Sequence, residues 1–541
     1  MRGIWVGAWW KLLALLVAAG LMVFAVGCGP APDDDDDDIV APDEPLPELK
    51  LAIGAEIQGT DPQQVTTTVE WVHGFIGTPP VDMGLENDQI LPYGAKEVEV
   101  SEDGLEIRLT FDPSRTFHNG VPVTAEAVKK SIERYLEISP YAFDYDPVEE
   151  MEVDGDTLVF TLNESGPALM VVLSSYYAAP IEVGAAEEMG EDQFHRETVG
   201  EGPYKVGEWV DGSHIILERF EDYQDYLPFV GSNAAFNFET INVRFIPEAF
   251  TRVSELRAGN VDMISGVPSE LLGTLEDDPD VVLHEYLNPN TRHIQMNTER
   301  FPFDDQRVRL AINYAIDRDE IAANLDHTIQ PQYGLVAPAM ISHDPATESQ
   351  LSQEFAHNLE RAKELLAEAG WEDTTGDGFL DKDGQTLSFE FVFANDVAAD
   401  QKAGPLVQAQ LERVGIQAEL REYESRYLRE LIGDSDFDMI LRNWSWLDPG
   451  GVWPAGLHSE GSLAPWSHPD VDALIDAAVV VPDPDERAQK WGELSVRVWD
   501  DVPLFAMWSD RLYLAARSDL EGFLMNVSGT NYFHDVTLDR D

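Results

Sequence analysis

The sequence predicts an α/β protein with more than one domain. The chain has 541 residues, and a single hydrophobic core stops growing at about 250–300 residues, so we expect two or three domains. Segments with strand character alternate with amphipathic helical segments, which is typical of a mainly parallel sheet covered by helices. With 44% hydrophobic residues, including 24 Phe, 16 Tyr and 13 Trp, the chain has ample material for these cores.

Residues 1–27 have the pattern of a signal peptide. Arg2 and Lys11 form the positive flank, and the apolar run 12–27 follows and ends in small residues. A spanning helix needs about 20 uninterrupted apolar residues, and Lys11 limits this run to sixteen. We therefore expect a cleaved export signal.

Cys28, the only cysteine of the chain, directly follows that segment. Cleavage before a cysteine resembles bacterial lipoprotein processing; Gly27 and Cys28 fit this pattern, whereas Ala25 departs from the usual leucine. The prediction is lipidation of Cys28 and attachment to a membrane surface. An ordinary signal peptide cut nearby is the alternative, and both place the protein outside the cytoplasm. Residues 28–48 include six consecutive aspartates and are predicted to be a disordered acidic tether.

The next elements form a small α+β unit. Residues 49–56 have the pattern of a strand, and residues 97–112 and 151–162 each alternate apolar and polar side chains around a turn, which predicts two β-hairpins. Between the hairpins, residues 123–138 carry apolar residues at helical spacing, with Thr124 as the N-cap.

Later segments show helix and strand in alternation. Residues 243–264 read strand, helix, glycine turn and strand, the order of a βαβ unit. Beyond residue 290 the amphipathic segments are 304–325, 359–370 and 483–501, and a strand is expected at 387–394.

The charge of the chain excludes some partners. Acidic residues outnumber basic ones by 101 to 35 and give a net charge of −66, which leaves no electrostatic footprint for nucleic acid. Such charge strains a compact fold by self-repulsion, which a Debye length of about 3 Å at 1 M salt screens. We expect a halophilic or saline-adapted protein, with a merely acidic exported protein as the alternative.

Six segments together resemble the family 5 extracellular solute-binding proteins of ABC importers, which include oligopeptide-, dipeptide- and nickel-binding proteins. They are residues 103–134, 200–206, 303–321, 360–371, 437–449 and 468–478. The resemblance implies a two-lobe, periplasmic-binding-protein-like clamshell that encloses a solute, with an additional α+β domain inserted in lobe one. It also implies a monomer without cofactor that delivers its solute to ABC permease subunits.

Domain limits follow from carrying the resemblance onto this chain. Lobe one is then residues 49–77, 199–289 and 502–541, the inserted domain is 78–198, and lobe two is 290–501. Hinges are expected near the two junctions between the lobes, at Pro289 and Asp501, where the backbone rotates on closure.

The candidate ligand-binding residues are Trp444, Trp446, Asp448 and Trp453. The tryptophans border a predicted strand end followed by Leu-Asp-Pro-Gly-Gly, and loops at such ends of an α/β sheet usually meet ligand. In peptide-binding members of the family, an aspartate three positions after the strand-end tryptophan pairs with the ammonium of the peptide. Here the third residue after Trp444 is Leu447, and Asp448 follows one position later, where it is still placed to pair with a cation.

The solute class stays open. Peptide-like solutes are favoured, and oligosaccharides are an alternative because tryptophan faces suit sugar rings. Nickel chelates are another alternative, although the twelve histidines contain no HxH or HxxxH pair and no metal site is predicted. Residues 373–385 have EF-hand-like spacing, but Gly384 stands where the bidentate glutamate is required, so we expect a β-hairpin there.

An exported hydrolase is the alternative from another functional class. The sequence contains no GxSxG, HExxH or P-loop pattern, so no catalytic residue is proposed.

Overall fold

The computed structural model describes residues 45–325, 328–461 and 466–539. Cys28, the predicted export signal and most of the predicted tether lie outside these residues. The prediction of a disordered tether up to residue 48 is wrong for residues 46–48, because they begin β1 and pair with β10. Among the helices in the described part of the chain, none combines the length and the apolar character needed to cross a membrane.

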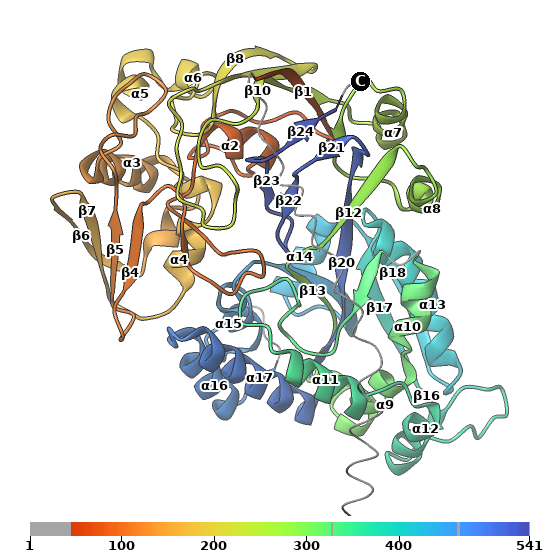
Figure 1. Cartoon of the computed structure of the whole chain (residues 1–541). Coiled ribbons are helices and arrows are strands. Elements are labelled where there is room, and N and C mark those ends of the chain that lie inside the picture. The colour runs from red at the N-terminus through yellow and green to blue at the C-terminus, as the bar shows by residue number, and fades with distance from the viewer. Residues whose placement is uncertain (1–44, 326–327, 462–465, 540–541) are drawn as a thin grey trace, which may run out of the picture. The chain divides into compact units, whose positions relative to one another are not determined.

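Twelve of the described strands form one mixed sheet (Figure 1). Its main path is β18-β17-β19-β13-β20-β11-β1-β10-β9-β8, and β12 and β14 pair with β20. The strands are β1 (Leu46–Ile53), β8 (Tyr204–Val210), β9 (His214–Arg219), β10 (Phe238–Phe245), β11 (Met263–Ile264), β12 (Val281–Leu287), β13 (Asn290–Met296), β14 (Ile329–Pro331), β17 (Ser388–Ala394), β18 (Gln417–Tyr423), β19 (Met439–Ser445) and β20 (Leu504–Arg517).

One half of this sheet is built around β1. β1 lies between β10 and β11 and is parallel to both, and α7 (Ala249–Arg257) connects those two strands. The predicted βαβ unit is therefore confirmed, with β1 inserted between its strands. Leu49 and Leu51 of β1 are buried with Ile241 and Val243 of β10, which gives this half its own core.

The other half is built around β17, which is parallel to its neighbours β18 and β19. The helices α13 (Ala398–Glu412) and α14 (Ser425–Gly433) contact β17. The predicted helical segment 304–325 is two helices, α9 (Gln306–Ala315) and α10 (Arg318–Asn324), because Asp317 caps the second one by accepting a hydrogen bond from the Glu320 amide at 3.0 Å.

β20 joins the two halves. Its first residues pair with β13, and its later residues pair with β11 and β12. The side chains of Phe505 and Trp508 pack in the core of the β17 half, whereas those of Leu514 and Ala516 pack in the core of the β1 half. The predicted lobe limits stay a proposal, and this packing favours a boundary near Ser509 in place of Val502.

A separate antiparallel sheet lies in residues 97–162, with strand order β4-β5-β7-β6. Its strands are β4 (Glu97–Val100), β5 (Glu106–Thr110), β6 (Val148–Asp154) and β7 (Thr157–Leu162), which confirms both predicted hairpins. α3 (Ala125–Ile138) packs on it, and Thr124 caps α3 as predicted, accepting a hydrogen bond from the Ala127 amide at 3.2 Å.

The remaining described elements are mostly short. Helices of residues 70–276 are α2 (Glu70–Ile76), α4 (Ala168–Leu173), α5 (Val183–Met189), α6 (Glu191–Phe194) and α8 (Leu272–Glu276). Later helices are α11 (Pro345–Glu354), α12 (Leu359–Glu368), α15 (Trp453–Leu457), α16 (Pro469–Val479) and α17 (Pro484–Asp501). The 3-10 turns are η1 (Ala142–Tyr145), η2 (Tyr176–Ala178), η3 (Ser269–Leu271) and η4 (Pro449–Gly451). The minor strands are β2 (Val81–Asp82), β3 (Leu91–Pro92), β15 (Asp381–Lys382), β16 (Gln385–Thr386), β21 (Leu520–Glu521), β22 (Leu524–Met525), β23 (Asn531–Tyr532) and β24 (Thr537–Leu538).

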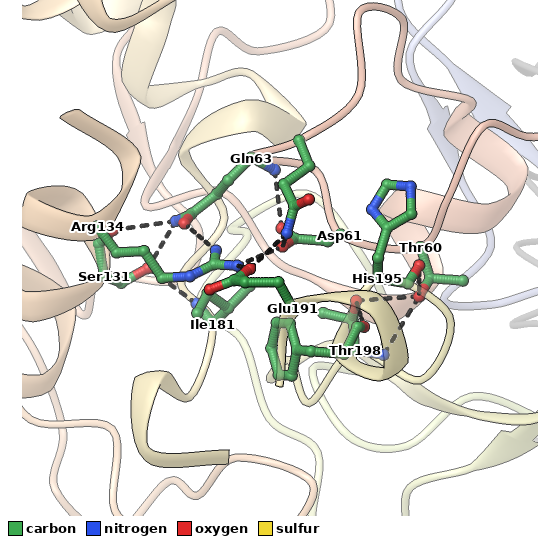
Figure 2. A network of polar contacts seen from close by, with 11 residues as sticks. Thr60, Asp61, Gln63, Ser131, Arg134, Ile181, Glu191, His195 and Thr198 are labelled. Carbon is green, nitrogen blue, oxygen red and sulfur yellow. Dashed lines mark hydrogen bonds and ion pairs between the residues drawn. The ribbon is translucent and has the colours of Figure 1, made fainter. Parts of the chain in front are cut away.

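A buried polar network attaches α3 to the loop that follows β1 (Figure 2). Arg134 of α3 donates to Asp61 at 2.7 Å, to Gln63 at 2.6 Å and to Glu191 of α6 at 2.5 Å. Gln63 in turn donates to the Ser131 hydroxyl at 3.0 Å. Because Asp61 and Arg134 are both buried, each satisfies the charge of the other.

Candidate functional site

The four predicted ligand residues lie in one segment, residues 444–455, which we call the aromatic loop. It begins at the end of β19. Asp448 starts η4 by accepting a hydrogen bond from the Gly450 amide at 2.8 Å. A Cβ at Gly451 would lie 2.5 Å from Trp446 Cδ1, so only glycine lets the backbone approach that indole ring so closely.

The structure gives the three tryptophans different surroundings. Trp444 and Trp453 are buried and stack on each other, with ring centroids 5.5 Å apart and planes 10° apart. Trp446 is 41% exposed. The ring of Trp446 therefore lines the first and second of the three cavities described below, whereas Trp453 packs behind Trp444 and borders none of them.

Asp448 already has a cationic partner in the protein. Arg487 of α17 donates to Asp448 Oδ1 at 2.7 Å, and both side chains are buried. Arg487 also donates to the Ser342 hydroxyl at 2.7 Å and to the Ala478 carbonyl at 3.1 Å. The sequence suggested Asp448 as a partner for a solute cation, but in this structure its charge is used to hold the aromatic loop on α17.

The first of three cavities beside the aromatic loop has a volume of about 640 Å³. Trp446, Asp448 and Pro454 of the loop line one part of it, and residues between 141 and 172 line another part. The apolar side chains of its lining include Phe143, Leu162, Leu169 and Val172. Its charged side chains are four carboxylates, Asp144, Asp146, Glu164 and Asp448, and Arg487, which is paired with Asp448. Burial raises the pKa of Asp144, although the Tyr135 hydroxyl donates to its carboxylate at 3.1 Å.

The second cavity, of about 410 Å³, adjoins the first, because Asp144, Val172 and Trp446 line both. Asp82 supplies another buried carboxylate here and accepts hydrogen bonds from the Gly84 amide at 2.7 Å and from the Tyr532 hydroxyl at 3.0 Å. Burial raises its pKa. The charged side chains that line the second cavity are thus carboxylates.

The third cavity, of about 520 Å³, lies among the ends of β17 and β19 and the helices α13 and α14. Arg292, Arg429 and Arg442 line it together with Asp400 and Trp444. Arg292 donates to Asp400 at 2.7 Å, and burial raises the pKa of Asp400 to about 6. Burial lowers the pKa of Arg442 to about 9.

Sequence reasoning missed Arg442 as a candidate. A usable signal was present, because Arg442 stands two positions before Trp444 in a predicted strand, and residues two apart in a strand face the same side. Arg292, on β13, has no comparable local signal, because its place beside β19 depends on long-range strand pairing.

The acidic loop of residues 373–385 is a hairpin, as predicted. β15 pairs with β16, and the Asp373 carboxylate accepts hydrogen bonds from the Gly376 and Gly378 amides at 2.6 and 3.1 Å. In the described part of the chain no three His, Cys, Asp or Glu side chains are grouped to hold a metal ion.

The sheet shared by two cored halves and the cavities beside the aromatic loop define a two-lobe, periplasmic-binding-protein-like molecule, which confirms the predicted fold class. The chain belongs to the bacterial extracellular solute-binding proteins, family 5, whose model for the middle region matches residues 89–461. The predicted family is therefore confirmed.

Two relatives and one solved structure illustrate the similarity. The oligopeptide-binding protein AppA of Bacillus subtilis is 27% identical over 344 residues, which cover 62% of this chain and 61% of AppA. The probable D,D-dipeptide-binding periplasmic protein DdpA of Escherichia coli is 23% identical over 461 residues, 82% of this chain and 84% of DdpA. The structure of HbpA2 from Haemophilus parasuis matches with a TM-score of 0.77 at 19% identity, covering 91% of this chain and all of HbpA2.

Proposed function

We propose that the protein is the extracytoplasmic solute-binding component of an ABC importer and that its solute is a peptide or a similar small molecule. The observation that carries this proposal is the charge pattern around the aromatic loop. Carboxylates predominate in the first and second cavities, where the one lining arginine, Arg487, is paired with Asp448, and arginines predominate in the third, which Asp400 also lines. A peptide carries an ammonium at one end and a carboxylate at the other, so both signs of charge in the site suit it. The printed names of AppA and DdpA support a peptide-like solute.

Capture works by closure of the lobes around the solute. The two connections are the Asn288–Pro289 link between β12 and β13 and the middle of β20 near Ser509. A solute that contacts both lobes only when they are closed shifts the population to the closed form, and a shift from 1:99 to 99:1 needs about 5.5 kcal/mol of preference. The closed form is what the permease subunits recognise, and this chain acts as a monomer without catalysis of its own.

The predicted lipid on Cys28 completes this proposal. Acyl chains on this residue hold the protein at the membrane surface where the permease lies. The acidic residues 29–45 then act as the tether between the anchor and the folded part, which begins with β1 at Leu46. Mass spectrometry of the N-terminal peptide from membrane-purified protein measures the acyl mass, and an unmodified thiol contradicts the anchor.

An oligosaccharide is the second candidate solute. It is favoured by the exposed ring of Trp446, because a flat apolar face stacks on a sugar ring at little cost in entropy. Saccharide and peptide differ in charge, so one panel of solutes distinguishes them.

Binding measurements on the purified protein test the proposal. Calorimetry with peptides of two to nine residues, with oligosaccharides and with nickel–histidine chelates identifies the solute class, and we expect the peptides to bind. Trp446→Ala should weaken peptide binding by about 2 kcal/mol, roughly 30-fold, as for a tryptophan hot spot. Its unfolding midpoint should stay unchanged because the side chain is 41% exposed.

Trp209→Ala is the matched control, because Trp209 lies on β8 and borders none of the three cavities. It should bind peptides as the wild type does. Saccharide binding without peptide binding would replace the proposed solute class, and binding of no solute in the panel would refute the proposal.

A further inference from the structure

Arg442 is a buried cation in the middle of β19, two residues before Trp444. Its side chain is 7% exposed and lines the third cavity. Its guanidinium lies over the ring of Trp444, 5.0 Å from the centroid, and Trp444 is supported from behind by Trp453. The stacked indole rings hold the planar guanidinium in place.

Arg442 lacks the partner that a buried charge normally has. Among the described residues no carboxylate lies within 4.0 Å of its guanidinium, and its Nη1 donates to Gln295 Oε1. The nitrogen atoms of Arg442 that do not bond to Gln295 are not fully buried. Because Arg442 lines the third cavity, we take their N–H groups to open onto it.

Other buried arginines of the described residues have either a carboxylate or backbone carbonyls as partners of the guanidinium. Each member of one group has a carboxylate oxygen 2.7 Å from its guanidinium: Arg115, Arg134 and Arg487. Each member of a second group donates to backbone carbonyls: Arg252, Arg309 and Arg318. Arg442 differs from both groups and lines a cavity.

The carboxylates near the third cavity contact Arg292 and not Arg442. Arg292 is paired with two of them, Asp400 at 2.7 Å and Asp510 at 3.2 Å, whereas Arg442 and the exposed Arg429 line the cavity without such a pair. The pKa of Arg442, lowered to about 9 by burial, still keeps it charged at neutral pH. The chain has 101 acidic and 35 basic residues, so carboxylates are plentiful. The lack of a carboxylate beside the buried Arg442 is therefore not explained by a shortage of acidic residues.

We infer that the third cavity is the part of the solute site that receives a carboxylate, with the Arg442 guanidinium as its ligand. This inference rests on the proposed function, because it concerns the same solute. A carboxylate presents two oxygen atoms in a plane and so matches the fork of N–H groups on a guanidinium. It comes either from the C-terminus of a peptide or from an acidic side chain.

Paired solutes test this inference by calorimetry. Trialanine through hexaalanine are compared as free acids and as C-terminal amides, and Ala-Ala-Glu amide is compared with Ala-Ala-Gln amide. The wild type should bind the members with a carboxylate about 10- to 100-fold more tightly, and the pair that shows the difference identifies the source of the carboxylate. Arg442→Met should abolish the difference while leaving amide binding unchanged, and Arg442→Lys should restore part of it.

Arg421→Met is the control, because Arg421 lies on β18, its side chain is 40% exposed, and it pairs with Glu390 and Glu419. It should keep the full preference for the free acid. Equal binding of acid and amide by the wild type, or an equal loss of both in Arg442→Met, overturns the inference and leaves the peptide-binding function standing. If the protein binds no peptide, the proposed solute class is refuted instead. The role of Arg442 is then tested by an unfolding measurement that uses no solute.

The measurement without solute is the unfolding midpoint in urea, with chloride as the only added anion. Because Arg442 is a buried charge without a carboxylate, Arg442→Met should leave the midpoint unchanged or raise it. Arg115→Met should lower it, because that change leaves the buried Glu201 unpaired. A loss in Arg442→Met as large as that in Arg115→Met would show that Arg442 only stabilises the fold and would overturn the inference.

Discussion

Replacement of Asp448 by alanine should destabilise the protein as well as change the site. The Arg487 side chain is 2% exposed and donates to Asp448 Oδ1 at 2.7 Å. Removal of the carboxylate leaves a buried guanidinium without its counter-charge, which typically costs about 3–5 kcal/mol. Loss of the cap on η4 adds about 1 kcal/mol. Against a typical stability of about 5–15 kcal/mol, this is a large fraction.

The assay is urea unfolding of Asp448→Ala, Arg487→Met and the double variant, followed by tryptophan fluorescence and far-UV circular dichroism. Each single variant should lose several kcal/mol, and the double variant should lose less than the sum, because removal of both partners leaves no unpaired charge. Asp470→Ala, which breaks a half-exposed pair with Arg497, is the control and should cost less than about 1 kcal/mol. An Asp448→Ala variant within 1 kcal/mol of the wild type, or strictly additive losses, would refute this reasoning.

Three further predictions concern stability. Arg134→Met should cost about 3–5 kcal/mol, since the buried Asp61 is left without a cationic partner. His293 is buried and its pKa is lowered to about 3, mainly by burial, against about 6.5 in an unfolded chain. The unfolded state therefore binds a proton that the folded state excludes, stability falls as the pH drops below 6.5, and His293→Gln should remove about 2 kcal/mol of the loss expected at pH 5. The net charge of −66 predicts that the unfolding midpoint rises from low salt to molar salt.

Each of these predictions has a contradicting result in the same unfolding assay. The control for Arg134→Met is Arg361→Met, on the exposed face of α12, which should change the free energy of unfolding by less than about 0.5 kcal/mol. If Arg134→Met changes it by no more than this control, the network of Figure 2 contributes little to stability. An unchanged pH profile in His293→Gln would mean that this imidazole takes up a proton in the folded state. A midpoint that is flat from 0.1 to 2 M salt would remove the saline-adaptation proposal.

Elements with a local signal could be predicted from the sequence. The hairpins at β4–β5 and β6–β7 have turn residues between alternating strands, and Thr124 caps α3. The break after α9 was missed, although Asp317 followed by Glu320 is itself a helix-start signal, because the apolar periodicity continues across it. The pairing of β20 with β11 and β12 in one half of the sheet and with β13 in the other depends on residues more than 200 positions away, and no local pattern reports it.

The candidate site was predictable in place but not in detail. The tryptophans and the glycines of residues 444–455 indicate a loop at a strand end, and the structure places Trp446 and Asp448 beside the first cavity. Sequence cannot tell which indole is buried, so Trp453 was grouped with the exposed Trp446 although it stacks behind Trp444. Nor could it tell that Asp448 is neutralised by Arg487, which is 39 positions away.

The position of β20 at the centre of the sheet also constrains the order of folding. This strand begins at Leu504, and it supplies hydrogen bonds to β11, β12, β13 and β14. A nascent chain that emerges N-terminus first must therefore wait for nearly its whole length before either half of the sheet can be completed. The last sheet pairings to form are therefore those of β20 with its four neighbours.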